Sequence, residues 1–224
     1  MTTVDLLAQR ARSLTTTRDR VIIGVAGSPG SGKTTLVEDL LTALRPDPPP
    51  GLAPGEWVAH VPMDGFHLAD VQLDRLGLRD RKGAPETFDA AGYVALLRRL
   101  RDPAEGVVYA PGFERDLEQP IAASLHVPRA ARLVLTEGNY LLLDQGPWRS
   151  VHGELDEVWF CDVPDRLRLD RLVRRHEQFG KTPSAAAAWA TGTDQANSAI
   201  VEATRDRATL VVSTAGRGGG SGGG

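Results

Sequence analysis

The sequence predicts an α/β fold in which helices cover both faces of a five-stranded parallel sheet. Short apolar runs, which are typical of buried parallel strands, alternate along the 224 residues with segments of helical periodicity. The runs expected to form strands are 21–26, 57–61, 133–136, 157–161 and 209–212. Because the alternation extends through most of the chain, we expect a single domain over residues 1–215.

The segments between these runs carry the signals of helices and loops. After the first run, apolar residues recur at helical spacing up to Leu44, and five prolines between positions 46 and 54 then predict a surface loop. Asp89 is a typical N-cap for a following helix, and further helices are expected over 166–176, 185–190 and 196–207. Ligands of such sheets bind beyond the carboxyl ends of the strands, so we expect a site there.

Composition excludes several classes of protein. The net charge of −3 argues against a basic nucleic-acid-binding surface, and no run of about 18 apolar residues predicts a membrane span. Cys161, the single cysteine, cannot form an internal disulfide and is expected in a buried strand, which favours a reducing, cytoplasmic location. The Gly- and Ser-rich segment 216–224 is expected to be a disordered linker. A homodimer is compatible with the sequence.

A glycine-rich motif follows the first predicted strand. Residues 27–34 read Gly-Ser-Pro-Gly-Ser-Gly-Lys-Thr and match the P-loop pattern G-x-x-x-x-G-K-[ST]. In such a loop, backbone N–H groups and the N-terminus of the next helix bind phosphate oxygens. A chance glycine-rich turn is the alternative, but the flanking strand and amphipathic helix favour nucleotide binding. We therefore expect ATP and Mg²⁺ at this loop, through Gly27, Ser28, Pro29, Gly30, Ser31, Gly32, Lys33, Thr34 and Thr35.

The predicted roles within the loop differ. Lys33 is expected to bridge the β- and γ-phosphates, and the hydroxyl of Thr34 is expected to ligate Mg²⁺. The loop predicts a P-loop NTPase fold, for which we expect the strand order 2-3-1-4-5, counted along the chain.

Carboxylates follow the second and third predicted strands. Asp64 is placed to accept the proton of an attacking hydroxyl, although an Asx-turn or a role as Mg²⁺ ligand is also open. Glu137 is placed to hold Mg²⁺ directly or through water, with a helix cap as the alternative. Together with the P-loop, these residues predict phosphoryl transfer.

Basic residues supply further candidates. Arg168, Arg171 and Arg175 share one face of the helix expected over 166–176, where an arginine could stabilise the transferring phosphoryl group and close over ATP as a lid. A solvated arginine face is the alternative, and Arg171 and Arg175 are our candidates. Loops 65–88 and 109–120 are expected to shape the acceptor pocket. The residues expected to contact the acceptor substrate are Asp64, His67, Lys82, Arg115 and Asn139.

Five segments together resemble the phosphoribulokinase/uridine kinase/pantothenate kinase family, above all its short bacterial, fructose-uptake-kinase-like branch. They are residues 27–34, 61–67 (Val-Pro-Met-Asp-Gly-Phe-His), 82–89 (Lys-Gly-Ala-Pro-Glu-Thr-Phe-Asp), 136–139 and 171–175. The resemblance extends over about residues 5–213. It implies that Asp64 is the catalytic base, that Glu137 is associated with Mg²⁺, and that the arginines of 171–175 belong to a lid.

The sequence thus predicts an ATP-dependent kinase acting on a hydroxyl of a small molecule, such as a sugar, a nucleoside or a pantothenate-like compound. A GTPase switch would need an Asn-Lys-x-Asp motif, and none of the three lysines lies in one. A nucleic-acid-linked ATPase is disfavoured by the acidic net charge. A nucleotide-binding regulator without catalysis is the remaining alternative.

Overall fold

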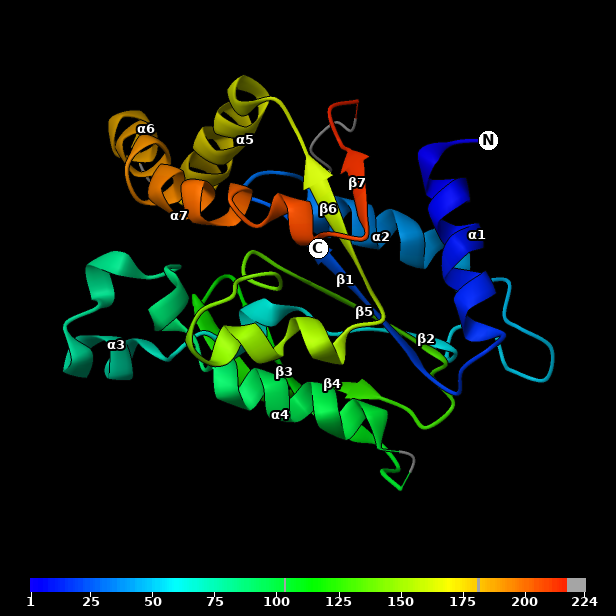
Figure 1. Ribbon diagram of the computed structural model, residues 1–224. Helices are drawn as coiled ribbons and strands as arrows, with labels where there is room; N and C mark the ends of the chain where they lie inside the picture. Colours follow the sequence, from blue (N-terminus) through cyan, green and yellow to red (C-terminus); the bar gives the residue numbers. More distant parts are fainter. Residues whose placement is uncertain (103, 181, 217–224) are drawn as a thin grey trace.

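Five parallel strands form the central sheet of the computed structural model, which describes residues 1–102, 104–180 and 182–216. They are β1 (Val21–Ala26), β2 (Val58–His60), β5 (Leu133–Gly138), β6 (Glu157–Asp162) and β7 (Leu210–Ser213), in the order β2-β5-β1-β6-β7 (Figure 1). Counted along the chain within this sheet, the order is 2-3-1-4-5, so the predicted topology is confirmed.

Helices cover both faces of the sheet. Helices α1 (Thr3–Thr15) and α2 (Lys33–Leu44) pack on one face, and α4 (Ala90–Arg101) packs on the other (Figure 1). Consecutive residues of β1 therefore enter different cores: Ile22 lies in the core beneath α4, and Ile23 lies in the core beneath α2. Burial on both faces explains why the strands are continuous apolar runs without alternation. Cys161 is buried in β6, as expected.

Three helices follow β6 and lie together above the edge of the sheet where the strands end (Figure 1). They are α5 (Asp165–Gln178), α6 (Pro183–Thr191) and α7 (Thr193–Glu202). The predicted helix over 196–207 is too long at its end, because α7 stops at Glu202. There the Thr204 N–H and hydroxyl both bond the Val201 carbonyl, and a separate 3-10 turn, η6 (Arg205–Arg207), follows.

The predicted loop over 109–120 is wrong, because most of it belongs to an antiparallel hairpin of β3 (Val108–Glu114) and β4 (Gln119–Val127). Two features hide this hairpin in the sequence. Pro111 and Gly112 interrupt β3 where the pairing register shifts, and most of β4 is solvent-exposed, so it lacks an apolar alternation. Helix α1 and the short helix α3 (Asp70–Leu76) were also not predicted.

The remaining elements are single 3-10 turns: η1 (Met63–Phe66), η2 (Arg79–Arg81), η3 (Pro85–Thr87), η4 (Gly146–Ser150) and η5 (His152–Glu154). None of the helices in the described ranges is long and apolar enough to cross a membrane. Of the segment expected to be a disordered linker, residues 217–224 lie outside the described residues.

Candidate active site

The glycine-rich loop connects β1 to α2 and surrounds a buried ammonium group. Lys33 Nζ donates to the carbonyls of Gly27 (2.9 Å) and Ser28 (3.1 Å), and to Asn139 Oδ1 (2.8 Å). Burial lowers the pKa of Lys33, and the nearby charge of Glu137 opposes this shift. The loop therefore holds a desolvated cation at its centre, where a polyphosphate would gain most from it.

Gly30 is required in this loop for two reasons. Its φ of +78° lies in the left-handed region, which side chains disfavour. A Cβ at this position would also lie 2.8 Å from the Arg168 carbonyl oxygen and 2.8 Å from Leu172 Cγ, both on α5. Helix α5 thus packs directly against the loop, where a lid over the phosphates would have to begin.

Glu137 and Thr34 meet beside the loop. Parallel pairing sets Val25 of β1 opposite Glu137 of β5, so the carboxylate emerges next to the residues that follow β1. Thr34 Oγ1 donates to Glu137 Oε1 at 3.0 Å. Burial raises the pKa of Glu137, and the charge of Asp64 raises it further, while Lys33 and the Thr34 bond act in the opposite direction. Ionising the Glu137 carboxyl group therefore costs free energy, and a further cation beside it would offset that cost.

Asp64 lies in η1, directly after β2, and faces the same space. Its Oδ2 is 3.7 Å from Nη2 of Arg115, which follows β3 at the tip of the hairpin. The adjacent glycine is required by close packing, because a Cβ on Gly65 would lie 2.1 Å from the Pro111 carbonyl oxygen. The hairpin consequently lies across η1 and brings Arg115 to the carboxylate.

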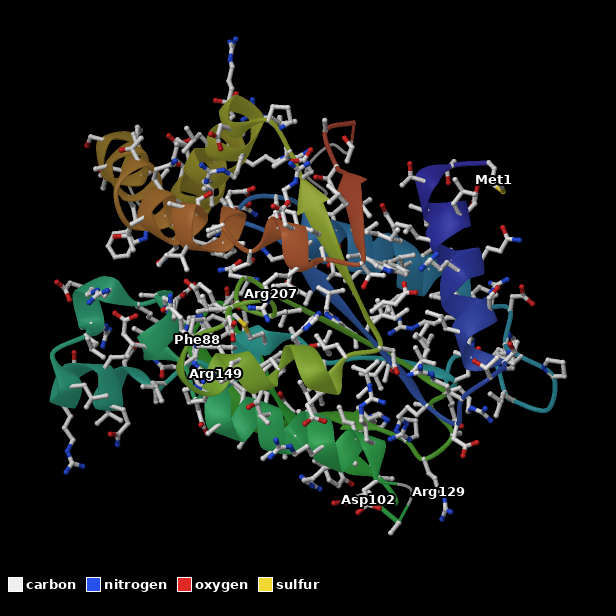
Figure 2. All side chains as sticks on the ribbon, viewed as in Figure 1. Met1, Phe88, Asp102, Arg129, Arg149 and Arg207 are labelled. Atoms are coloured by element: carbon white, nitrogen blue, oxygen red, sulfur yellow. The ribbon has the colours of Figure 1, made fainter. Side chains whose placement is uncertain are left out.

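Residues 66–68 and 87–89, near the two ends of the segment expected to shape the acceptor pocket, lie side by side. The Leu68 N–H donates to the Thr87 carbonyl at 2.9 Å, and the Asp89 N–H donates to the Phe66 carbonyl at 2.8 Å. Between these bonds, the His67 ring stacks on Phe88 with ring centroids 3.9 Å apart. Phe88, labelled in Figure 2, precedes the N-cap of α4. His67 is therefore part of a packed aromatic wall.

A cavity of about 740 Å³ connects these groups. Its lining includes most of the predicted site residues: Pro29, Lys33, Thr34, Asp64, His67, Lys82, Arg115, Glu137, Asn139 and Arg175. Arg171 lies outside this lining, because its guanidinium lies against Gly32 and its Nη2 donates to the Thr214 carbonyl at 3.0 Å. Arg168 is buried and bonds Asp165 and Gln195. Only one of the three arginines on this face of α5 thus reaches the cavity.

Sequence reasoning missed the contribution of α7. Asp194 Oδ2 is 2.7 Å from His176 Nε2 of α5, and Asn197 Nδ2 donates to the Gly83 carbonyl at 3.3 Å. Glu202 Oε1 accepts a 2.5 Å hydrogen bond from the hydroxyl of Ser28. Helix α7 therefore contacts the glycine-rich loop, helix α5 and the loop before α4. The helical spacing of Asp194, Asn197 and Val201, all buried, was the available signal.

A Glu137→Gln variant is expected to be more stable than the wild type at neutral pH when no nucleotide is bound. Because the pKa of Glu137 is raised in the folded state, the folded protein binds a proton at this carboxyl group more tightly than the unfolded chain does. The free energy of unfolding therefore falls as the pH rises from 4.5 through the raised pKa. Glutamine keeps an acceptor for Thr34 and removes this loss. We expect the melting temperature of the variant to exceed that of the wild type by a few degrees at pH 8.

Melting curves from pH 4.5 to pH 8 check this expectation. The difference should shrink as the pH falls toward 4.5, because the wild-type carboxyl group becomes increasingly protonated in both states. Glu154→Gln serves as the control. Glu154 does not line the cavity, and its carboxylate pairs with Arg98 at a distance of 2.9 Å. A difference that is constant with pH, or an equal gain in the control, would contradict the assigned cause.

Comparison with known proteins shows to which family this chain belongs. No protein-family model matches the chain. A putative uridine kinase from Schizosaccharomyces pombe is 35% identical over 176 residues, which cover 77% of this chain and 73% of the relative. The uncharacterized protein YggC from Escherichia coli is 35% identical over 195 residues, which cover 86% of this chain and 77% of that protein.

Solved structures agree with these relatives. The crystal structure of a putative fructose transport system kinase from Silicibacter sp. TM1040 matches 95% of this chain and 100% of its own, with 37% identity and a TM-score of 0.82. The structure of YFH7 from Saccharomyces cerevisiae, a putative P-loop containing kinase with a circular permutation, has a TM-score of 0.82 and covers 97% of this chain and 100% of its own. At 20% identity, it supports the fold alone.

The fold, the phosphate loop and these relatives define a P-loop kinase. The chain belongs to the family of P-loop kinases that includes this putative uridine kinase and the putative fructose transport system kinase. This confirms the resemblance inferred from residues 27–34, 61–67 and 82–89.

Proposed function

We propose that this protein transfers the γ-phosphoryl group of ATP to a hydroxyl group of a small molecule. The observation that carries the proposal is the convergence, on one cavity, of a buried ammonium (Lys33), a hydroxyl–carboxylate pair (Thr34 and Glu137) and a second carboxylate (Asp64). Phosphoryl transfer needs few other groups, because catalysis consists mainly of positioning and of neutralising charge.

The phosphates of ATP are assigned to the glycine-rich loop. Lys33 already holds three oxygen acceptors, and phosphate oxygens would replace some of them as acceptors. Asn139 would then act as a positioning residue that keeps the ammonium directed at the loop. Arg175 lines the same cavity from α5 and is assigned to the transferring group, where its charge would offset the negative charge that develops.

The donor set beside the loop fits Mg²⁺. This hard cation prefers oxygen ligands and commonly takes one or two from the protein and the rest from phosphates and water. Thr34 Oγ1 and Glu137 Oε1, which are 3.0 Å apart, would hold it. The ion, when bound, would neutralise charge on the β- and γ-phosphates.

Asp64 is assigned to the acceptor hydroxyl. It follows β2 at the same edge of the sheet as the phosphate loop, and Arg115 holds its carboxylate from the hairpin. A carboxylate placed there can orient the hydroxyl and accept its proton as the oxygen attacks phosphorus. Arg115, His67 and Lys82 line the part of the cavity beyond it and are assigned to the acceptor.

A screen of ADP release tests this proposal. The full chain is incubated with ATP and Mg²⁺, and candidate sugars, nucleosides and pantothenate are added one at a time. We expect at least one acceptor to accelerate ADP release well above the rate with water alone. If ATP binds but no hydroxyl compound raises the rate, the protein is a nucleotide-binding regulator and the proposed function is wrong.

A further inference from the structure

On the acceptor side of the cavity, each cation in the described part of the chain is paired with an acidic group. We call the acceptor wall the charged lining residues that come from segment 64–82 and from the tip of the β3–β4 hairpin: Asp64, Asp70, Arg79, Lys82, Arg115, Asp116 and Glu118. This wall holds three cations and four carboxylates, so it has no excess of positive charge. A wall built for a phosphate or carboxylate group would be expected to have the opposite balance.

Asp70 neutralises two of the three cations. Its Oδ1 is 2.8 Å from Lys82 Nζ, and its Oδ2 is 2.7 Å from Arg79 Nη2. Lys82 also donates to the Glu118 carbonyl, and the side chain of Lys82 is only 16% exposed. An anionic acceptor that approached Lys82 would also meet the negative charge of Asp70, which lies 2.8 Å from the same ammonium group.

The third cation is engaged by the proposed base. Arg115 Nη2 lies 3.7 Å from Asp64 Oδ2, and an anion that drew Arg115 away would also place its own charge beside Asp64. Among the described lining residues, the other two cations are Lys33 and Arg175, which the proposed function assigns to ATP. Every cation among the described lining residues is therefore either paired with an acidic group or assigned to a nucleotide phosphate.

Next to the charged wall lies an uncharged aromatic one. The His67 ring stacks on Phe88, and the centroids of the His67 and Phe113 rings are 5.1 Å apart. Lys82 Nζ lies 5.6 Å from the centroid of the Phe113 ring. Burial lowers the pKa of His67 to about 4, so its imidazole is neutral at pH 7. Such a surface accommodates the apolar face of a ring, while the paired side chains beside it can exchange hydrogen bonds with hydroxyl groups.

We infer, resting on the proposed function, that the acceptor is an uncharged hydroxylated ring compound, such as a free sugar or a nucleoside, rather than a sugar phosphate or a carboxylic acid. The acceptor wall would select against anions by electrostatic repulsion, and the His67–Phe88–Phe113 wall would hold the ring. A sugar and a nucleoside share this chemistry, and the experiment below separates them.

A fractionated substrate pool tests the inference. A bacterial small-molecule extract, supplemented with known sugars, nucleosides, sugar phosphates and pantothenate, is divided on an anion exchanger into neutral and anionic fractions. The full chain is given each fraction with Mg²⁺ and ATP labelled at the γ-phosphate. We expect at least about tenfold more label in products from the neutral fraction. Adsorption of the neutral acceptors on charcoal then distinguishes nucleosides from sugars.

The outcomes separate the two proposals. Label transferred mainly to the anionic fraction would overturn the inference while leaving the kinase function intact. Transfer to neither fraction, in a protein that binds ATP, would overturn the kinase function and this inference with it. Asp64→Asn protein, prepared in the same way, gives the background from contaminating kinases.

A pair of variants tests the charge argument itself. Asp70→Asn removes the carboxylate shared by Arg79 and Lys82 and is expected to raise the share of label in the anionic fraction about tenfold. Asp74→Asn is the matched control, because Asp74 pairs with Arg79 at 3.3 Å, is 62% exposed and does not line the cavity. An unchanged share in Asp70→Asn, or an equal rise in the control, would contradict the inference.

Discussion

Replacing Lys33 with methionine is expected to lower turnover by roughly 10³-fold or more and to weaken ATP binding. The ammonium is buried in the loop, where low local dielectric strengthens its attraction to phosphate, and no other cation of the described loop residues 27–35 can replace it. Methionine has a similar length and adapts to irregular packing, so the fold around α2 should persist. ADP release and calorimetry with ATP measure the two effects.

Lys82→Met is the matched control for this variant. Lys82 lines the same cavity, but it pairs with Asp70 on the acceptor side instead of the phosphate loop. We expect the control to bind ATP as tightly as the wild type does. Equal weakening of ATP binding in both variants would show that the loss is not specific to the phosphate loop, and normal turnover in Lys33→Met would refute the assignment.

The second large effect is expected for Asp64→Asn, which should retain ATP binding but lose roughly 10²–10⁴ in turnover. Asparagine has nearly the same shape as aspartate, but its amide cannot take the proton of the acceptor hydroxyl. The loss should therefore appear in kcat, with little change in the affinity for ATP. Steady-state ADP release with an acceptor from the screen, together with ATP calorimetry, separates the two quantities.

Asp116→Asn controls for the loss of a negative charge in the same cavity. Asp116 lines the acceptor wall but has no place in the proposed chemistry, so its variant should keep turnover within a few-fold of the wild type. Parallel losses of ATP affinity and turnover in Asp64→Asn would indicate a role in holding the nucleotide or its metal instead of a role as base.

Residues that follow strand ends were the most predictable part of the site. Apolar runs identify parallel strands, and the carboxyl ends of such strands meet at one edge, so the glycine-rich loop, Asp64 and Glu137 had to converge. The cavity contains Lys33, Thr34, Asp64 and Glu137 together, as this reasoning required. Their chemical roles remain proposals.

Residues outside those positions were less predictable, and the arginines of α5 show why. Helical spacing places Arg168, Arg171 and Arg175 on one face, yet the first is buried, the second bonds the Thr214 carbonyl, and the third lines the cavity. Periodicity states which residues share a face. It does not state which neighbouring element covers each turn of the helix.

The sequence by itself therefore determined the order of the strands in the central sheet, the position of the glycine-rich loop and the edge of the sheet at which the candidate site forms. These features are local, since they depend on hydrophobic runs, on glycine and on residues adjacent to strand ends. Only the tertiary structure revealed the hairpin over Gly65, the contacts of α7 and the pairing of Asp70 with Lys82 and Arg79. Each of these depends on contacts between separate elements of the fold, and the pattern of a single segment carries no record of which partner it will meet.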